Sequence, residues 1–169
     1  MSTPVSLSER PLSLWRVDFH ELYARHLCRH SQFGNNVVHL VAVFGTWLAI
    51  YGLVRWLVGT PWAAVGLAVA HLLLLAVNIP ARLALVSGLF MALTIAVVWL
   101  LPPPWWLCLV LVPVCYVVQN WGHRIWTVEK DMTEFNRKYP KGSLLFTVLT
   151  LYEIPILLNY LVFNRSDWS

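Results

Sequence analysis

Long apolar segments separated by short breaks dominate the pattern of hydrophobic and polar positions along this chain. Four of them cover residues 37–58, 62–77, 83–101 and 105–119, and a fifth covers residues 144–163. Each approaches the roughly 20 residues that a helix needs to cross the hydrocarbon core of a bilayer. Prolines stand in the breaks at residues 59–61, 78–80 and 102–104, where they favour helix ends. The pattern therefore predicts an all-α integral membrane bundle with four to five transmembrane helices.

The fifth apolar segment leaves two alternatives open. It contains Glu153, Pro155 and Asn159. The segment either crosses the bilayer or lies against the bundle as a broken helix, and we expect it to cross.

The N-terminal part of the chain has a different pattern. Charged and apolar residues are mixed at residues 12–29, and the apolar residues at positions 15, 19, 22 and 23 follow helical spacing. This spacing predicts an amphipathic helix lying on the membrane, and the polar first ten residues predict no cleaved signal peptide. We therefore divide the chain into an interfacial segment at residues 1–36, a transmembrane bundle at residues 37–163 and a C-terminal tail at residues 164–169.

Composition excludes an ordinary soluble domain. Hydrophobic residues make up 59% of the 169 residues and charged residues only 12%, against roughly 25% charged residues in a soluble domain. The ten tryptophans suit a membrane–water interface. The net charge of +4 comes from too few and too scattered residues to indicate nucleic-acid binding. The three cysteines form no CxxC pair, so we expect them to be reduced.

The distribution of lysine and arginine predicts the orientation of the bundle. Basic residues precede the first span and follow the fourth, whereas the loops at the other ends of the spans contain few. An even number of spans puts both basic regions on one side, which the positive-inside rule assigns to the cytosol. The host membrane would be a bacterial inner membrane or the endoplasmic reticulum.

Histidines gather at this predicted cytosolic face. His39 lies just inside the start of the first span, His123 just past the end of the fourth, and His30 leads into the first. Ionisable groups at one depth of a membrane bundle are functional candidates. Three imidazoles with the carboxylates Glu129 and Asp131 nearby would suit Fe, Zn or Cu, and Glu129 is the candidate fourth ligand. The alternative is that these histidines only form hydrogen bonds with backbone or lipid phosphate.

Two amide side chains could orient these imidazoles. Asn35 precedes His39 by four residues, and Gln119 precedes His123 by four, so each pair shares a helix face. Both amides are therefore candidates to fix an imidazole tautomer.

The remaining histidines and the known sequence motifs add little. We expect His71 to be a satisfied polar group between helices, and His20 and His26 to contact solvent or lipid headgroups. No GxGxxG, P-loop, GxSxG or HExxH motif occurs, which disfavours nucleotide binding and the commoner hydrolase classes.

Short motifs at these same positions resemble those of a known family. Residues 30–39 contain the pattern H-x4-N-x3-H. This pattern opens the first helix of the family of small membrane proteins that includes the fungal endoplasmic-reticulum 2-hydroxy-fatty-acid dioxygenase of α-oxidation. Residues 119–123 are similar to the Q-x-x-G-H motif at the end of that family's last core helix, and residues 81–85 resemble its arginine-containing turn. The resemblance extends over residues 22–129.

The resemblance implies a site and a reaction. In that family, histidines are thought to hold Fe(II), and O2 is used to remove one carbon from a 2-hydroxy acyl chain. By resemblance, His30, His39 and His123 would be the ligands, supported by Asn35 and Gln119, and the substrate would be a lipid or fatty acid. Two other classes stay open: a non-catalytic lipid-binding or scaffold protein, and a haem or electron-transfer module with His39 and His123 as axial ligands.

Overall fold

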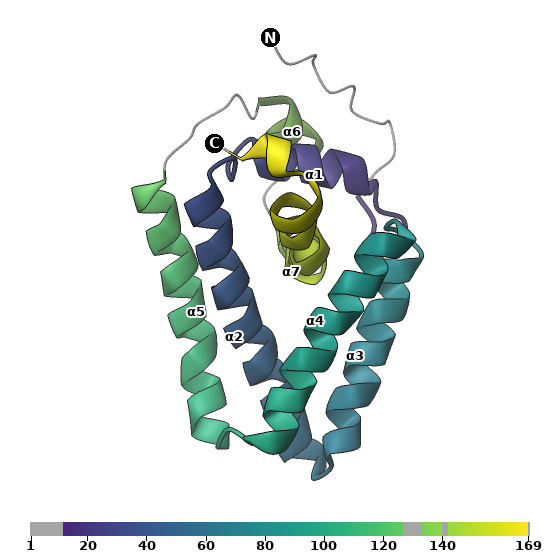
Figure 1. The fold of residues 1–169 in the computed structure, drawn as a ribbon, viewed down its shortest axis with the longest axis vertical. Coiled ribbons are helices and arrows are strands. Elements are labelled where there is room, and N and C mark those ends of the chain that lie inside the picture. Colours follow the sequence, from purple (N-terminus) through teal and green to yellow (C-terminus); the bar gives the residue numbers. More distant parts are fainter. Residues whose placement is uncertain (1–11, 127–132, 140–141, 169) are drawn as a thin grey trace.

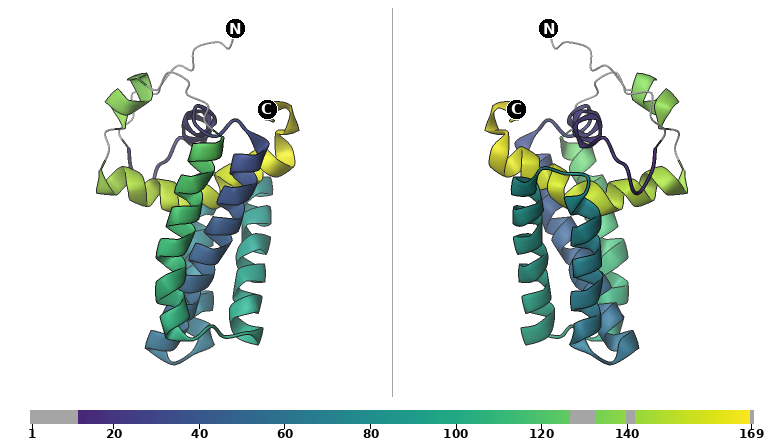
Figure 2. Two further views of the ribbon diagram at one scale, coloured as in Figure 1. Left: turned by 90° about the vertical axis from the view of Figure 1, so that its left-hand side faces the viewer. Right: turned by 90° about the vertical axis from the view of Figure 1, so that its right-hand side faces the viewer.

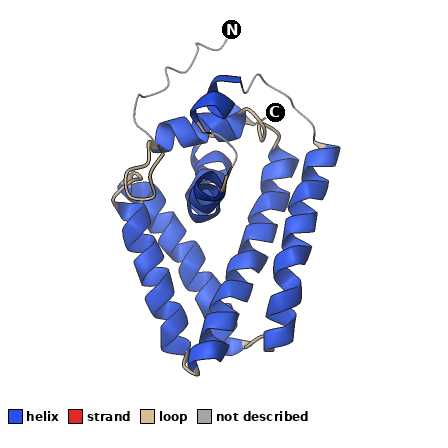
Figure 3. Cartoon of the chain, turned by 180° about the vertical axis from the view of Figure 1, so that it is seen from behind, coloured by secondary structure: helices blue, strands red, loops and turns tan. Residues whose placement is uncertain are grey.

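The chain consists of helices and loops over the part that this computed structural model describes, residues 12–126, 133–139 and 142–168. Four helices run alongside one another as a bundle (Figure 1): α2 (Phe33–Val58), α3 (Pro61–Ala76), α4 (Ala81–Leu100) and α5 (Trp105–Ile125). The end of the bundle where α2 begins and α5 ends is called the capped end. The other helices lie there: α1 (Phe19–Leu27), α6 (Thr133–Lys138), α7 (Ser143–Leu158), the π-turn η1 (Asn159–Phe163) and the 3-10 turn η2 (Arg165–Asp167). The predicted all-α bundle is confirmed, and its helical arrangement is also seen from behind (Figure 3).

Several helices have the character of membrane spans. By length and apolar composition, α2, α4, α5 and the continuous segment Ser143–Phe163 could cross a bilayer, whereas α3 is apolar but has only 16 residues. Large apolar side chains on α4 and α5 are more than half exposed, among them Leu89, Leu93, Val110 and Val117. An exposed apolar surface of this kind is compatible with contact to lipid and unfavourable in water.

The segment Ser143–Phe163 lies differently from the other candidate spans. It crosses the capped end instead of running alongside the bundle helices (Figure 2). More than half of its most apolar stretch is buried by the protein, whereas most of the corresponding stretch is not buried in α2, α4 and α5. A membrane normal along the bundle would place this segment parallel to the membrane surface. The expectation that it crosses the bilayer stays a prediction.

Two helices are longer than the sequence pattern predicts. α2 begins at Phe33, so the predicted domain boundary at residues 36 and 37 falls within its first turn. α5 continues to Ile125, six residues beyond the predicted end at residue 119. Polar side chains lie in both extensions, the buried Asn35 and Asn36 in α2 and the partly buried His123 in α5, which explains why apolar periodicity did not reveal them. As a result His39 and His123 both lie on regular helix.

The predicted N-terminal amphipathic helix exists but is shorter, and its apolar face packs on protein. α1 begins only at Phe19, where the Asp18 carboxylate accepts a hydrogen bond from the Glu21 backbone N–H at 3.1 Å. Phe19 and Leu22 are buried in the same apolar cluster as Tyr152 of α7. These apolar residues are therefore covered by protein, and the expectation that the helix lies on the membrane stays a prediction.

Glycines bring α2 and α5 close together. A Cβ atom at Gly45 would lie 2.6 Å from Sγ of Cys115, and one at Gly52 would lie 2.7 Å from Sγ of Cys108. These glycines are seven residues apart and so face the same way. The buried cysteines form no disulfide among the described residues, as expected. Close packing along this seam aligns the start of α2 with the end of α5, and thereby sets His39 beside His123.

Candidate metal centre

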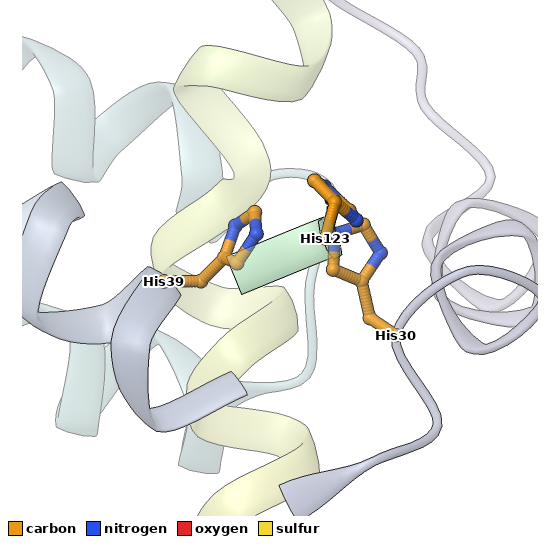
Figure 4. Close-up of side chains that lie close together, drawn as sticks. All are labelled: His30, His39 and His123. Carbon is orange, nitrogen blue, oxygen red and sulfur yellow. Dashed lines mark hydrogen bonds between the residues drawn. The ribbon is translucent and has the colours of Figure 1, made fainter. Parts of the chain in front are cut away.

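Three histidines converge at the capped end (Figure 4). His39 comes from the second turn of α2, His123 from the last turn of α5, and His30 from the loop between α1 and α2. One ring nitrogen from each lies within 4.8 Å of the others, and Nε2 of His30 is 3.2 Å from Nε2 of His123. Two nitrogens bound to one ion at about 2.0–2.1 Å in tetrahedral geometry lie roughly 3.3 Å apart. The predicted clustering of these three side chains is confirmed.

His39 is oriented by two polar side chains. Its Nδ1 lies 3.1 Å from Oε1 of Glu153 on α7, and the Gln119 side-chain amide donates to the same oxygen at 3.1 Å. Because a carboxylate oxygen only accepts, Nδ1 carries a hydrogen, and in the neutral imidazole the lone pair is then on Nε2. That Nε2 is buried and has no hydrogen-bond partner among the described residues. A buried lone pair of this kind is available to a metal ion.

His30 is oriented in the same sense by backbone. Its Nδ1 lies 3.3 Å from the His26 carbonyl oxygen, so Nδ1 donates and Nε2 faces the cluster. The His26 ring stacks on the His30 ring with centroids 4.1 Å apart. Burial lowers the pKa of His26 to about 3, and burial followed by the charge of His26 lowers the pKa of His30 well below its ordinary value. Both imidazoles are therefore neutral near pH 7, the form in which histidine binds metals.

Asn36 holds the loop that carries His30. Its Oδ1 accepts from Nε2 of His26 at 2.7 Å, and its Nδ2 donates to the carbonyl oxygens of His30 and Gln32. The side chain is fully buried. Asn36 thus ties the end of α1 and the His30 loop to the first turn of α2.

We expect Asn36→Ala to lower the free energy of unfolding by about 1–3 kcal/mol, because it leaves buried hydrogen-bonding groups without a partner. Unfolding in mixed detergent micelles measures this change. Asn120→Ala is the matched control, since exposed Asn120 donates within its own helix, to the Tyr116 carbonyl oxygen at 2.9 Å. Equal losses of stability in the two variants would contradict the assigned role of Asn36.

A cavity of about 460 Å³ adjoins the three histidines. It extends along α2 from His39 to Trp47 and along α5 from His123 to Val112, about 12–16 Å by helix rise. Gln119 and Glu153 face its polar end. Its other walls are mainly apolar: Val43, Trp47, Val112, Pro113, Phe146, Leu149 and Ile156. The volume and this mixture of walls are typical of a small-molecule site.

Of the two residues predicted to orient the histidines, Gln119 and Asn35, Gln119 lies at the polar end of the cavity and Asn35 lies between α2 and α5. Gln119 lies in the site, but it bonds to Glu153 instead of directly to His123. Asn35 is fully buried and lies against Gly122, where a Cβ atom would be 2.8 Å from Oδ1 of Asn35. Neither polar atom of the Asn35 side chain has a hydrogen-bond partner among the described residues. Asn35 therefore packs in the seam between α2 and α5. Its neighbour Asn36 holds the His26 ring and the loop that carries His30.

Two further predictions concern Glu129 and the other histidines. Glu129 and Asp131 lie outside the described residues. His71 is buried, with Nε2 2.8 Å from the Leu151 carbonyl oxygen, but its Nδ1 has no hydrogen-bond partner among the described residues, so the expected satisfied polar group is confirmed for one ring nitrogen and not for the other. His26, expected at solvent or headgroups, is instead buried beside His30.

Sequence reasoning missed Glu153 as a site residue. A carboxylate within an otherwise apolar segment is a functional candidate by itself, and this signal was present. No spacing rule connects it to His39, however, because 114 residues separate them.

Comparison of the chain with protein-family models, with curated proteins and with solved structures found no match.

Proposed function

We propose that this chain is a membrane-embedded, metal-dependent oxygenase that uses Fe(II) and acts on a fatty acid. The observation that carries the proposal is the convergence of three imidazoles at the polar end of an otherwise largely apolar cavity. Three imidazoles suit Fe, Zn, Cu or Ni by ligand type. The resemblance of residues 30–39 and 119–123 to the α-oxidation dioxygenase family favours Fe(II) and a 2-hydroxy fatty acid.

The surroundings of the site suit such a substrate. The capped end, where the histidines lie, corresponds to the ends of candidate spans. A fatty acid entering from a bilayer has its polar group at this depth and its chain among helices. Under the positive-inside rule the capped end faces the cytosol, in either a bacterial inner membrane or the endoplasmic reticulum.

Each part of the site would have a distinct task. His30, His39 and His123 would hold the ion, and Glu153 with Gln119 would keep the His39 ring in its binding orientation. The apolar walls would hold the acyl chain and exclude water. When bound, Fe(II) supplies open positions for a chelating 2-hydroxy carboxylate and the electron-transfer chemistry that O2 requires.

The overall reaction balances without an added reductant. Cleavage of the bond between C1 and C2 converts a 2-hydroxy acid and O2 into an acid one carbon shorter, carbon dioxide and water. The organic substrate loses four electrons, and O2 gains four.

The geometry argues against the haem alternative. The His39 and His123 ring centroids are 4.9 Å apart, and the His30 ring lies 4.5 Å from each. A porphyrin held between His39 and His123 would have to occupy the space that His30 fills. The lipid-binding alternative is separated from the oxygenase by experiment.

We expect protein purified anaerobically to contain near-stoichiometric iron, and to consume one O2 for each 2-hydroxy fatty acid shortened by one carbon. Metal analysis, an oxygen electrode and mass spectrometry measure these quantities. The matching fatty acid without a 2-hydroxyl group is the control, since it lacks one chelating oxygen and should not react. Folded protein that binds fatty acid but retains no transition metal would support the lipid-binding alternative and overturn the oxygenase.

A further inference from the structure

The cavity beside the histidines contains two arginines whose role the metal centre does not explain. Arg25 lies in the last turn of α1, and Arg29 follows it by four residues in the adjoining turn. Both line the cavity together with His30 and His123. α1 and the turn that follows it thus bring two positive charges to the polar end of a cavity with mainly apolar walls.

Arg25 is buried in an unusual way for an arginine. Only 8% of its surface is exposed, and its Nε has no hydrogen-bond partner among the described residues. Burial, followed by the charge of Arg29, lowers the pKa of Arg25. Burying a guanidinium group without a counter-charge is costly, so such groups normally face a carboxylate or another anion.

Four carboxylates whose side chains the structure describes are engaged elsewhere. Glu21, one helical turn before Arg25, bonds to Lys138 and Tyr139. Glu153 bonds to His39 and Gln119. The remaining two are Asp18, which caps α1, and Asp167, which accepts from Tyr23.

We propose that Arg25 and Arg29 form the seat for the carboxylate of a single-chain fatty acid, and so select free acids over esters and alcohols. A guanidinium fork pairs with a carboxylate through two parallel hydrogen bonds, which a neutral ester cannot match. The mainly apolar walls from Val43 to Trp47 continue from this seat and accommodate the chain. The inference rests on the proposed function in that it locates the acid group beside the metal centre, but the binding step itself needs no metal.

The test is binding to the full chain in nanodiscs of zwitterionic lipid, with and without added Fe(II) under anaerobic conditions. The probes are 2-hydroxyhexadecanoic acid and its methyl ester, measured by calorimetry. We expect the parent protein to bind the acid at least about tenfold more tightly than the ester. Arg25→Gln should weaken binding of the acid about 10- to 100-fold and leave binding of the ester unchanged. The affinity of Arg25→Lys for the acid should lie between those of the parent and of Arg25→Gln.

Two more variants keep the test decisive. Arg29→Gln alters an exposed residue, so it tests the seat even if the buried substitution prevents folding, and it should weaken acid binding as well. Arg16→Gln replaces an exposed arginine outside the cavity and should leave the affinities for acid and ester unchanged. Equal affinity for acid and ester in the parent, or unchanged acid binding in both cavity variants, would overturn the seat.

The two proposals can fail separately. Arginine-dependent binding of the acid to protein that retains no transition metal would support the seat and overturn the oxygenase. Iron-dependent shortening of the acid that is insensitive to Arg25→Gln and Arg29→Gln would overturn the seat and support the oxygenase.

Discussion

Replacing His39 with alanine is expected to remove nearly all tightly bound metal from the protein. His39 contributes the buried Nε2 that has no hydrogen-bond partner among the described residues, and its ring lies within 5 Å of the rings of His30 and His123. Loss of a group that only orients a ligand typically costs 10- to 100-fold in metal affinity, so loss of the ligand itself should cost more. His30→Ala and His123→Ala should behave alike. Metal content after purification, together with competition against a chelator, measures the effect.

Two controls separate ligation from folding. His20→Ala changes an exposed histidine on α1, and His71→Ala changes a buried one that bonds to the Leu151 carbonyl oxygen. Both variants should keep the metal content of the parent, although His71→Ala should be less stable. If all of the histidine variants retained the same metal content, the three histidines would not be the ligands.

Replacing Glu153 with alanine is expected to weaken metal binding about 10- to 100-fold while the fold remains intact. The carboxylate accepts from Nδ1 of His39 and from the Gln119 amide, so it fixes the tautomer and raises the basicity of the ligating nitrogen. Glu153→Gln should have a smaller effect, because its amide oxygen can still accept from His39 although the charge is lost. Chelator competition gives the affinities, and nitrogen NMR of labelled histidine reports the tautomer of His39.

Gln119→Ala is the matched comparison for Glu153. It removes one donor to the carboxylate and leaves the contact between Glu153 and His39, so its effect should be smaller than that of Glu153→Ala. The positioning role would be refuted by a Glu153→Ala protein with unchanged metal affinity and an unchanged His39 tautomer.

Local pattern was sufficient to predict the secondary structure and the general character of this chain. Helix existence follows from apolar runs bounded by proline and glycine, and the run at residues 83–101 corresponds closely to Ala81–Leu100. The start of α2 and the end of α5 were less well predicted, because these turns carry the polar side chains of Asn35, Asn36 and His123. Local pattern also could not predict what covers the apolar residues of α1, because such residues fit a membrane surface and a protein surface equally well.

The clustering of His30, His39 and His123 could be predicted because it depends on topology. With four helices, α2 to α5, between the two polar regions, both regions lie at the same end of the bundle, and depth along a helix follows from residue number. Contacts among particular side chains could not be predicted in this way. Asn35 and Asn36 are adjacent in sequence, and only the direction in which each points decides that Asn36 bonds to His26.

The sequence by itself therefore determined an all-helical, strongly apolar bundle with histidines gathered at one end, because helical period, hydropathy and chain polarity are local properties. The tertiary structure alone decided that α7 crosses this end, that Glu153 orients His39, and that Arg25 is buried beside the same cavity. The contact between His39 and Glu153 joins residues 114 positions apart, and the geometry of the site depends on how closely α2 and α5 pack at Gly45 and Gly52. Spacing rules that act over one or two helical turns contain no information about such packing.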